Sequence, residues 1–435
     1  TSIDEWAFVY DAAVERLCRQ MEVKTLKGFA IESFPLGICS AGALLVYLEQ
    51  TCHTGLRNIS SIGRIDESKF VWMDRFTIRN LEIFQSGSGP EGTSLLQTID
   101  HCSSPMGARL LRQYLALPVI DLKELRSRHD IVGHFVDNPE RLEEVQQLIG
   151  DIGDLERILS RVATGKVGPR EMMQLSRGLS RMEPVKECCS RKGCAPLDAL
   201  VGGLVACGDA AMKIRETLAP EPAIQIGKGP VIADGVDPEL DEYRAISSGG
   251  KDILLKMQQE EAERTGISSL KIGFNNVFGY YIEVRNTFKD KVPPEWNRKQ
   301  TLVGAERYVT QELKEYEEKI LSAEDRIYSI ETRLFSELVS SLQKRIRDIQ
   351  KNCSVIARLD VLASFAEQAS ERGYCRPVMT DGFALDIKAL RHPVIETMMP
   401  LGEEYVPNDV YLDREKQQII ILTGPNMAGK SALLR

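Results

Sequence analysis

The clearest pattern of hydrophobic and polar positions lies between residues 313 and 334. Its apolar residues recur at alternating intervals of three and four, which is the spacing of a coiled-coil seam. A helical pattern continues from residue 309 to about 368 with little interruption, which predicts up to about 90 Å of helix if it is straight. The seam positions are Leu313, Tyr316, Ile320, Ala323, Ile327, Ile330 and Leu334.

A second helical pattern precedes this seam, and a β-rich stretch separates the two. Residues 240–257 follow helical spacing, although Gly249-Gly250 predicts an interruption. Residues 266–308 are rich in aromatic and β-branched residues, and Pro293-Pro294 excludes a helix there. We therefore expect long antiparallel helical arms over residues 237–345, with a small β unit at their tip.

The residues before the arms predict two further parts. Residues 76–236 are mostly helical in pattern, and Ser103-Ser104-Pro105 is typical of a capped helix start. Residues 346–376 predict a helix that returns to this domain. Residues 1–75 predict a small α/β unit, with helices at Trp6–Leu17 and Ala41–Gln50 and strands at Gly28–Glu32 and Val71–Met73.

Residues 377–435 return to strand character and carry a phosphate-binding motif. Strands are predicted at Phe383–Ile387 and Asp409–Asp413. Gln418–Thr423 predicts a short strand buried on both faces, because it is mostly apolar and β-branched. Gly424–Ser431 then fits G-x-x-x-x-G-K-[ST]. We expect the truncated start of a P-loop α/β ATPase domain, and the alternative is an ordinary glycine-rich turn.

The chemistry of such a loop predicts ATP and Mg²⁺ as cofactors. Its glycines let successive backbone N–H groups point at phosphate oxygens. Lys430 supplies a charge for the β- and γ-phosphates, and the Ser431 hydroxyl is a ligand for Mg²⁺ held through the nucleotide. The predicted ATP-binding residues are Gly424, Pro425, Asn426, Met427, Ala428, Gly429, Lys430 and Ser431.

Composition narrows the class of protein. The 435 residues suffice for two to four domains. The apolar share of 43% and charged share of 27% are those of a soluble globular protein, and no apolar run is long enough to span a membrane. The ten cysteines are scattered, which predicts reduced thiols in the cytosol. The chain does not begin with Met, so we expect a fragment or a processed chain.

Charge is distributed unevenly between the predicted tip and the whole chain. The net charge of −8 argues against general affinity for nucleic acid, whereas the tip has seven basic and four acidic residues. A basic tip can grip a phosphate backbone without reading bases. The alternative is a solvated hairpin with incidental charge. The candidate DNA-contacting residues are Lys271, Arg285, Lys289, Lys291, Arg298 and Lys299.

Several motifs, in this order, resemble the MutS family of DNA mismatch-repair proteins. The similarity covers almost the whole chain and includes the entry to a lever domain, a clamp segment with its return, and the approach to an ATPase core. The residues that carry it are 72–83, 106–112, 274–284, 298–302, 305–310, 391–396 and 423–431.

This resemblance implies a function in DNA mismatch repair. It implies that the intact protein binds mismatched double-stranded DNA under the control of ATP, as a homodimer with a MutL-type partner, in the cytoplasm and at the nucleoid. Residues 1–75 would be a connector remnant, 76–236 and 346–376 a lever, and the arm tip a DNA clamp. The family's Phe-x-Glu wedge is not expected here, because Phe335-Ser336-Glu337 and Phe365-Ala366-Glu367 lie in helical patterns.

Two alternatives remain open from the sequence. A structural P-loop coiled-coil protein of chromosome maintenance would carry a hinge at the arm tip, and its phosphate loop would lie near the N-terminus. A mismatch-independent MutS paralogue is disfavoured by the connector-like residues 1–75. His392, which precedes a proline, has either a structural role or a place beside the adenine.

A chain limited to these 435 residues is expected to show negligible ATP turnover. Hydrolysis needs an acidic Mg²⁺ ligand and a water-activating residue in addition to the phosphate loop, and the resemblance places both after Arg435. Phosphate release should therefore be the same for this chain and for its Lys430→Ala variant. Turnover that Lys430→Ala abolishes would contradict the expectation.

Overall fold

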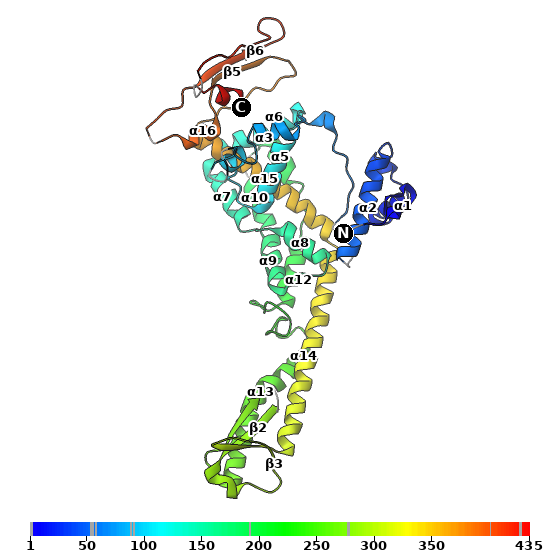
Figure 1. Ribbon diagram of the computed structural model, residues 1–435, viewed down its shortest axis with the longest axis vertical. Coiled ribbons are helices and arrows are strands. Elements are labelled where there is room, and N and C mark those ends of the chain that lie inside the picture. The colour runs from blue at the N-terminus through cyan, green and yellow to red at the C-terminus, as the bar shows by residue number, and fades with distance from the viewer. Residues whose placement is uncertain are drawn as a thin grey trace. The chain divides into compact units, whose positions relative to one another are not determined.

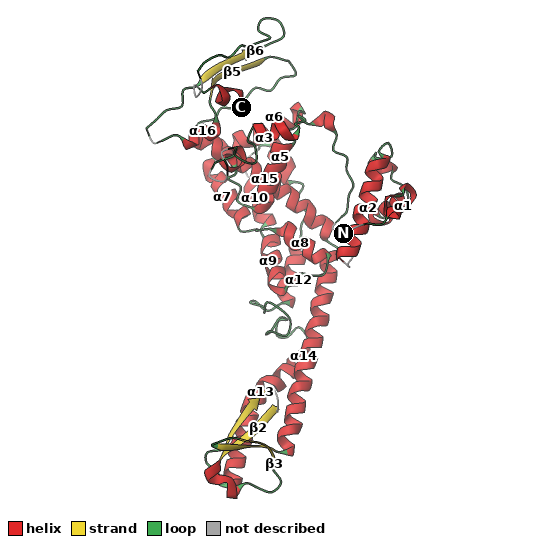
Figure 2. Ribbon diagram, viewed as in Figure 1, coloured by secondary structure: helices red, strands yellow, loops and turns green. Residues whose placement is uncertain are grey.

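The computed structural model describes residues 3–52, 56, 59–87, 89, 92–190, 193–275, 279–400, 402–425 and 429–435, without the side chains of 52, 248–253 and 320–321. The chain is mainly helical, as predicted, and its sheets are small and antiparallel (Figure 2). It divides into two compact units. The first comprises Thr1–Val167, Gln174–Met212 and Leu342–Arg435, and the second comprises Gly168–Met173 and Lys213–Ser341.

The helices and strands are labelled in Figure 1 by their order along the chain. The helices are α1 (Tyr10–Met21), α2 (Pro35–Cys52), α3 (Arg75–Asn80), α4 (Leu95–Ile99), α5 (Pro105–Ala116), α6 (Leu122–Val136), α7 (Pro139–Gly150), α8 (Leu155–Ala163), α9 (Pro169–Ser180), α10 (Met182–Ser190), α11 (Ala195–Val201), α12 (Gly208–Thr217), α13 (Pro238–Thr265), α14 (Gln311–Gln343), α15 (Ile346–Arg372), α16 (Pro393–Met398) and α17 (Lys430–Leu434). The strands are β1 (Lys271–Asn275), β2 (Gly279–Arg285), β3 (Asn297–Thr301), β4 (Ala305–Val309), β5 (Leu385–Leu390) and β6 (Asn408–Leu412). Short 3₁₀ helices are η1 (Glu5–Phe8), η2 (Lys27–Phe29), η3 (Glu67–Lys69) and η4 (Asn286–Lys291).

Helix α15 is the centre of the first unit. It contacts α5, α6, α7 and α8, which surround it in Figure 1, and most of its side chains are buried. Because it is surrounded in this way, its polar side chains also lie in the core. Asn352, Asp360, Ser364 and Gln368 are each at most 3% exposed.

Each of these buried polar groups bonds a segment far away in the sequence. Asn352 exchanges two hydrogen bonds with the backbone of Val205, at 2.8 and 2.9 Å. The Ser364 hydroxyl accepts from the His101 amide at 3.1 Å. A buried polar group without a partner costs roughly 1–3 kcal/mol. These bonds therefore specify which loop lies against which turn of α15.

Asp360 makes the tightest of these connections. Its carboxylate accepts from the Ser103 amide at 2.8 Å, the Ser104 amide at 2.9 Å and the Ser104 hydroxyl at 2.6 Å. Burial raises the pKa of Asp360, while the bonds from Ser104 and Ser103 act in the opposite direction. Ser104 is also the predicted N-cap of α5, with Pro105 at the first helical position. One carboxylate therefore fixes the start of α5 against α15.

The strands predicted in residues 1–75 do not form in the described part of that stretch. Gly28–Glu32 falls on η2 and a turn, where Ala30 adopts left-handed backbone angles. Near Val71 the backbone makes only an isolated bridge between Phe70 and Val119, and Trp72 is 63% exposed. A strand needs a partner along its length. The described residues instead form a helical pair in which α1 packs against α2.

The structure differs from the predicted helices at two places. One predicted break is absent, and one long helical pattern contains a break. Helix α13 continues through Gly249-Gly250, so the glycine pair does not interrupt it. The helical pattern that continues from 309 to about 368 with little interruption is divided between α14 and α15 at Lys344-Arg345, at the predicted boundary between the arms and the returning helix. Arg345 has non-helical backbone angles, and its guanidinium bonds Asp209 at 2.7 Å, Asp348 at 2.9 Å and the Ala206 carbonyl at 3.0 Å. Contacts with distant residues thus accompany the break.

The second unit contains α13, a four-stranded antiparallel sheet and α14. The sheet order is β1-β2-β4-β3, and β4 was not among the predicted strands. Leu313, Ala323 and Ile330 of the predicted seam are buried. Glu331 is also buried and accepts from the Arg244 guanidinium of α13 at 2.7 Å and from the Val231 amide at 3.0 Å. This carboxylate connects α14 both to α13 and to the segment that precedes α13.

Within the described residues, no helix combines the length and the apolar character that crossing a bilayer would require.

The close contact between Asp360 and Gly107 gives a stability test. A Cβ at Gly107 would lie 2.1 Å from Asp360 Oδ2, so the carboxylate would have to move. We expect Gly107→Ala to lower the free energy of unfolding by about 1–3 kcal/mol, despite the better helix propensity of alanine. The matched control is Gly150→Ala, since a Cβ at this helical glycine meets nothing within 4 Å.

Thermal unfolding followed by circular dichroism separates the two variants. The Gly107→Ala midpoint should fall, whereas the Gly150→Ala midpoint should stay or rise. Equal midpoints for both variants would show that the Asp360 contact is not a constraint.

Candidate functional site: nucleic-acid interface and phosphate loop

The sheet of the second unit has two faces with different chemistry. In the ladder, Ile282 pairs with Tyr308 and Val284 with Glu306, and all four side chains are buried. They pack with Trp296 and with apolar residues from α13 and the start of α14. Neighbouring positions along a strand point to opposite faces. The residues between them therefore point to an outer face, where Ala305 and Val309 are buried and the charged residues are partly or fully exposed.

The outer face is predominantly basic. Glu283 of β2 pairs with Lys271 of β1 and with Arg307 of β4, and Arg285 follows two positions later on β2. Arg307 bonds Glu283 at 3.2 Å and lies 4.2 Å from the centre of the Tyr281 ring. The stacked guanidinium is thus held flat on the sheet by an ion pair and a cation–π contact.

The six candidate DNA-contacting residues are all exposed, but their surroundings differ. Lys271 and Arg285 lie at strand ends on the outer face, and Lys299 lies at an irregularity of the edge strand β3. For these three, no ion pair is found within the described part of the chain. Lys291 lies 3.5 Å from the Gly266 carbonyl. Lys271, Arg285 and Lys299 are therefore the candidates best placed to contact a ligand from solution.

Lys289 and Arg298, by contrast, share an acidic partner. Lys289 Nζ lies 2.9 Å and Arg298 Nη1 3.5 Å from Oε1 of Glu306, while the Tyr308 hydroxyl donates to Oε2. The Tyr308 and Lys289 contacts lower the pKa of Glu306. Burial and the Glu306 carboxylate raise the pKa of Tyr308 to about 12. At neutral pH the cluster consists of one carboxylate, two cations and a neutral phenol.

From the sequence, Glu306 is predicted only to be one of the four negative charges of the tip. Its partnership with Lys289 and Arg298 was missed because β4 itself was not predicted. The alternation of residues 306–309 offered a signal, since Glu306 and Tyr308 have the parity of one strand face. A buried carboxylate at such a position needs a hydrogen-bond or ion-pair partner.

The phosphate loop lies in the first unit, and its middle residues Asn426, Met427 and Ala428 are outside the described residues. Lys430 begins α17, and its ammonium group donates to the Gly424 carbonyl at the start of the loop. Gly429 has a φ of 82°, while a Cβ there would meet nothing within 4 Å. A left-handed backbone, rather than lack of space, therefore favours glycine at this position.

The strand predicted before the loop is not formed. Ile419 is 80% and Ile421 84% exposed, and among the described residues β5 and β6 pair only with one another. A buried parallel strand requires neighbours on both sides. The strands predicted near 383–387 and 409–413 correspond to β5 and β6, with Leu385 opposite Leu412.

His392 has a structural role at the start of α16. Its Nδ1 accepts from the Ile395 amide at 3.4 Å, and burial lowers its pKa. It also lines a cavity of about 760 Å³ together with Ser431. The neighbouring Arg391 donates to the carbonyls of Arg372 at 3.0 Å and Gly373 at 3.3 Å, at the end of α15. The approach to the loop is therefore attached directly to the central helix.

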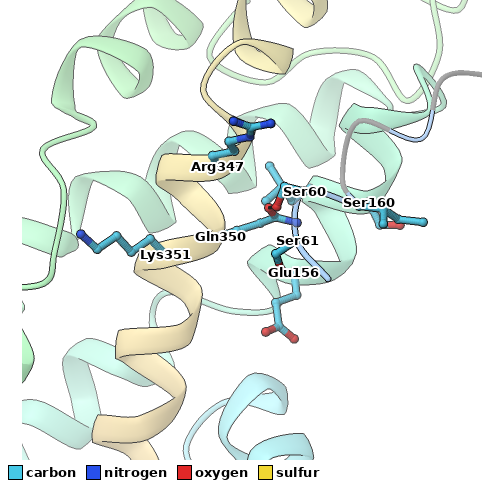
Figure 3. A pocket seen from close by; sticks show the side chains of 9 residues that line it. Ser60, Ser61, Glu156, Ser160, Arg347, Gln350 and Lys351 are labelled. Carbon is cyan, nitrogen blue, oxygen red and sulfur yellow. Dashed lines mark hydrogen bonds between the residues drawn. The ribbon is translucent and has the colours of Figure 1, made fainter. Parts of the chain in front are cut away.

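A second cavity, of about 550 Å³, lies beside α8 and α15. Figure 3 shows that the charged ends of Arg347, Lys351 and Glu156 point away from one another. Ser60 bonds Gln350 at 3.1 Å. Because its charged groups diverge, this cavity is not a candidate ligand site. No cluster of three or more His, Cys, Asp or Glu suited to a metal is found where the chain is described.

Comparison of the sequence with known proteins identifies the family of the chain. Residues 76–366 match the sequence model of the family described as MutS domain III.

The chain belongs to the MutS family.

Curated relatives named DNA mismatch repair protein MutS are identical to it at about half of the aligned positions. Those from Parabacteroides distasonis and Bacteroides fragilis are 53% and 52% identical over 433 residues, which is 100% of this chain and 50% of each relative. The relative from Porphyromonas gingivalis is 48% identical and is covered to 48%. The chain thus spans about half the length of the MutS relatives it matches.

Proposed function

We propose that this chain is the lever and DNA-clamp part of a DNA mismatch-repair protein. In the intact protein, ATP would control the binding of mismatched double-stranded DNA. The observation that carries the proposal is the basic outer face of the β1–β4 sheet, on a chain of the MutS family. The name of its relatives, DNA mismatch repair protein MutS, supports a role in mismatch repair and does not favour a chromosome-maintenance protein or a mismatch-independent paralogue.

The clamp would bind the DNA backbone rather than the bases. Lys271, Arg285 and Lys299 are exposed cations on a small sheet, and they would supply positive charge for phosphate groups. Contacts of this kind position DNA and strengthen binding, but they carry no sequence information. Lys291 would add a fourth charge, and Lys289 and Arg298 would contribute from their cluster with Glu306.

The phosphate loop would hold ATP with Mg²⁺. Lys430 would exchange its contact with Gly424 for the phosphates, and Ser431 would be a ligand of Mg²⁺. The bonds from Arg391 to the end of α15 offer a route by which a change at the loop reaches the central helix. Together with a second copy and a MutL-type partner, this arrangement would couple ATP to DNA binding in the cytoplasm, at the nucleoid.

Charge reversal on the sheet tests the clamp. The triple variant Lys271→Glu, Arg285→Glu, Lys299→Glu should weaken binding to a 30-base-pair duplex at least tenfold. The slope of log K against log salt should become shallower by about 2–3, because each lost phosphate contact removes about 0.9 from it. Fluorescence anisotropy at several salt concentrations measures both quantities.

The matched control reverses three exposed lysines of the same unit that are not on the sheet strands. Lys213→Glu, Lys228→Glu, Lys256→Glu changes the net charge equally, and it should retain most of the slope. If the two triple variants lose affinity and slope to the same extent, the sheet is not the DNA-binding surface.

A further inference from the structure

Glu306 is a buried carboxylate beneath two exposed cations. Its side chain is 3% exposed, whereas those of Lys289 and Arg298 are 53% and 57% exposed. Glu306 lies on the buried face of the sheet rather than on the outer face. Its charge still reduces the net positive charge of the DNA-binding tip, and its burial is unfavourable unless its oxygens are satisfied. By charge alone, Glu306 therefore opposes the proposed function of this sheet.

The geometry points to a positioning role instead. We propose that Glu306 holds Lys289 and Arg298 in place to receive phosphate groups of double-stranded DNA. This inference rests on the proposed DNA-clamp function and adds a residue that sets the geometry of its contacts.

The carboxylate is itself held rigidly. Its Oε2 accepts from the Tyr308 hydroxyl, and the Tyr308 ring packs 5.9 Å from that of Trp296, between centres, in the core of the unit. This leaves Oε1 for the two cations. Glu306 lies on β4, which pairs with β2 on one side and with β3 on the other.

The two cations come from different segments. Lys289 lies on η4, which has non-helical backbone angles at Phe288, and Arg298 lies on the edge strand β3. Glu306 is their common contact. An irregular turn and a sheet edge are thereby connected to the central strand through one oxygen atom.

Holding these side chains in advance favours binding. Free lysine and arginine side chains occupy many rotamers, and a ligand must select one of them. An anchored ammonium or guanidinium has already lost much of that freedom. Each group also retains N–H donors beyond the one directed at Glu306, since Lys has three and Arg five.

A Glu306→Gln variant distinguishes a positioning role from an effect of net charge, because the two predict opposite changes in the affinity for DNA. The substitution adds one net positive charge, so counting predicts tighter binding to DNA. Positioning predicts weaker binding, because the amide holds the cations poorly. We expect Kd for a 30-base-pair duplex to rise about three- to tenfold, with a salt slope shallower by about 1–2.

The control is Glu295→Gln in the full 435-residue chain. Glu295 is an exposed partner of Arg264, and its substitution makes the same change of charge in the same unit. It should leave the affinity unchanged or raise it up to about twofold. Unchanged or tighter binding by Glu306→Gln would overturn the positioning role.

A second background separates positioning from folding of the tip. In a Lys289→Ala, Arg298→Ala protein, Glu306→Gln should cause less than a twofold further loss, because the groups it positions are absent. An equal loss in both backgrounds would show that Glu306 acts through the fold and would overturn the proposal. If the unsubstituted chain does not bind the duplex at all, the clamp function itself fails; if it binds and only the Glu306 result fails, the clamp stands without this residue.

Discussion

The first unit depends on the need to satisfy polar groups inside a helix that is buried on nearly every side. Helix α15 carries Asn352, Asp360 and Ser364 into the core, and each can be accommodated only if a distant segment supplies its partner. Hydrophobic packing by itself tolerates rotation and sliding of helices. A buried carboxylate that accepts three hydrogen bonds does not, so Asp360 fixes both the position and the start of α5.

The second unit uses the same physical constraint on a smaller scale. Glu331 joins α14 to α13, and Glu306 joins two surface cations to the central strand β4. A small four-stranded sheet with one basic face has little apolar area to organise it. Buried acceptors therefore contribute geometry that packing could not, and at Glu306 that geometry bears directly on the proposed contacts with DNA.

Prediction from the sequence was accurate where local chemistry decides. The start of α5 was recognisable from Ser104 and Pro105 because an N-cap and a first-turn proline act within a few residues. The break between α14 and α15 falls at the predicted domain boundary between residues 345 and 346, but its backbone geometry depends on distant residues, since Arg345 is engaged by Asp209 and the Ala206 carbonyl. Likewise, the segment at Ile419 has every local feature of a strand, but no described strand pairs with it.

In the candidate sites, too, some features follow from local sequence and others from tertiary contacts. The sequence by itself determined the helical character of most of the chain, the basic excess of residues 266–308 and the phosphate-loop motif, because composition and short spacing encode them. Only the tertiary structure decided that Lys271 and Arg285 share the outer face while Lys289 and Arg298 meet at Glu306. Strand register and the burial of a carboxylate depend on residues brought together across the sheet. The alternation at residues 306–309 could therefore indicate that Glu306 is buried, but not which cations contact it.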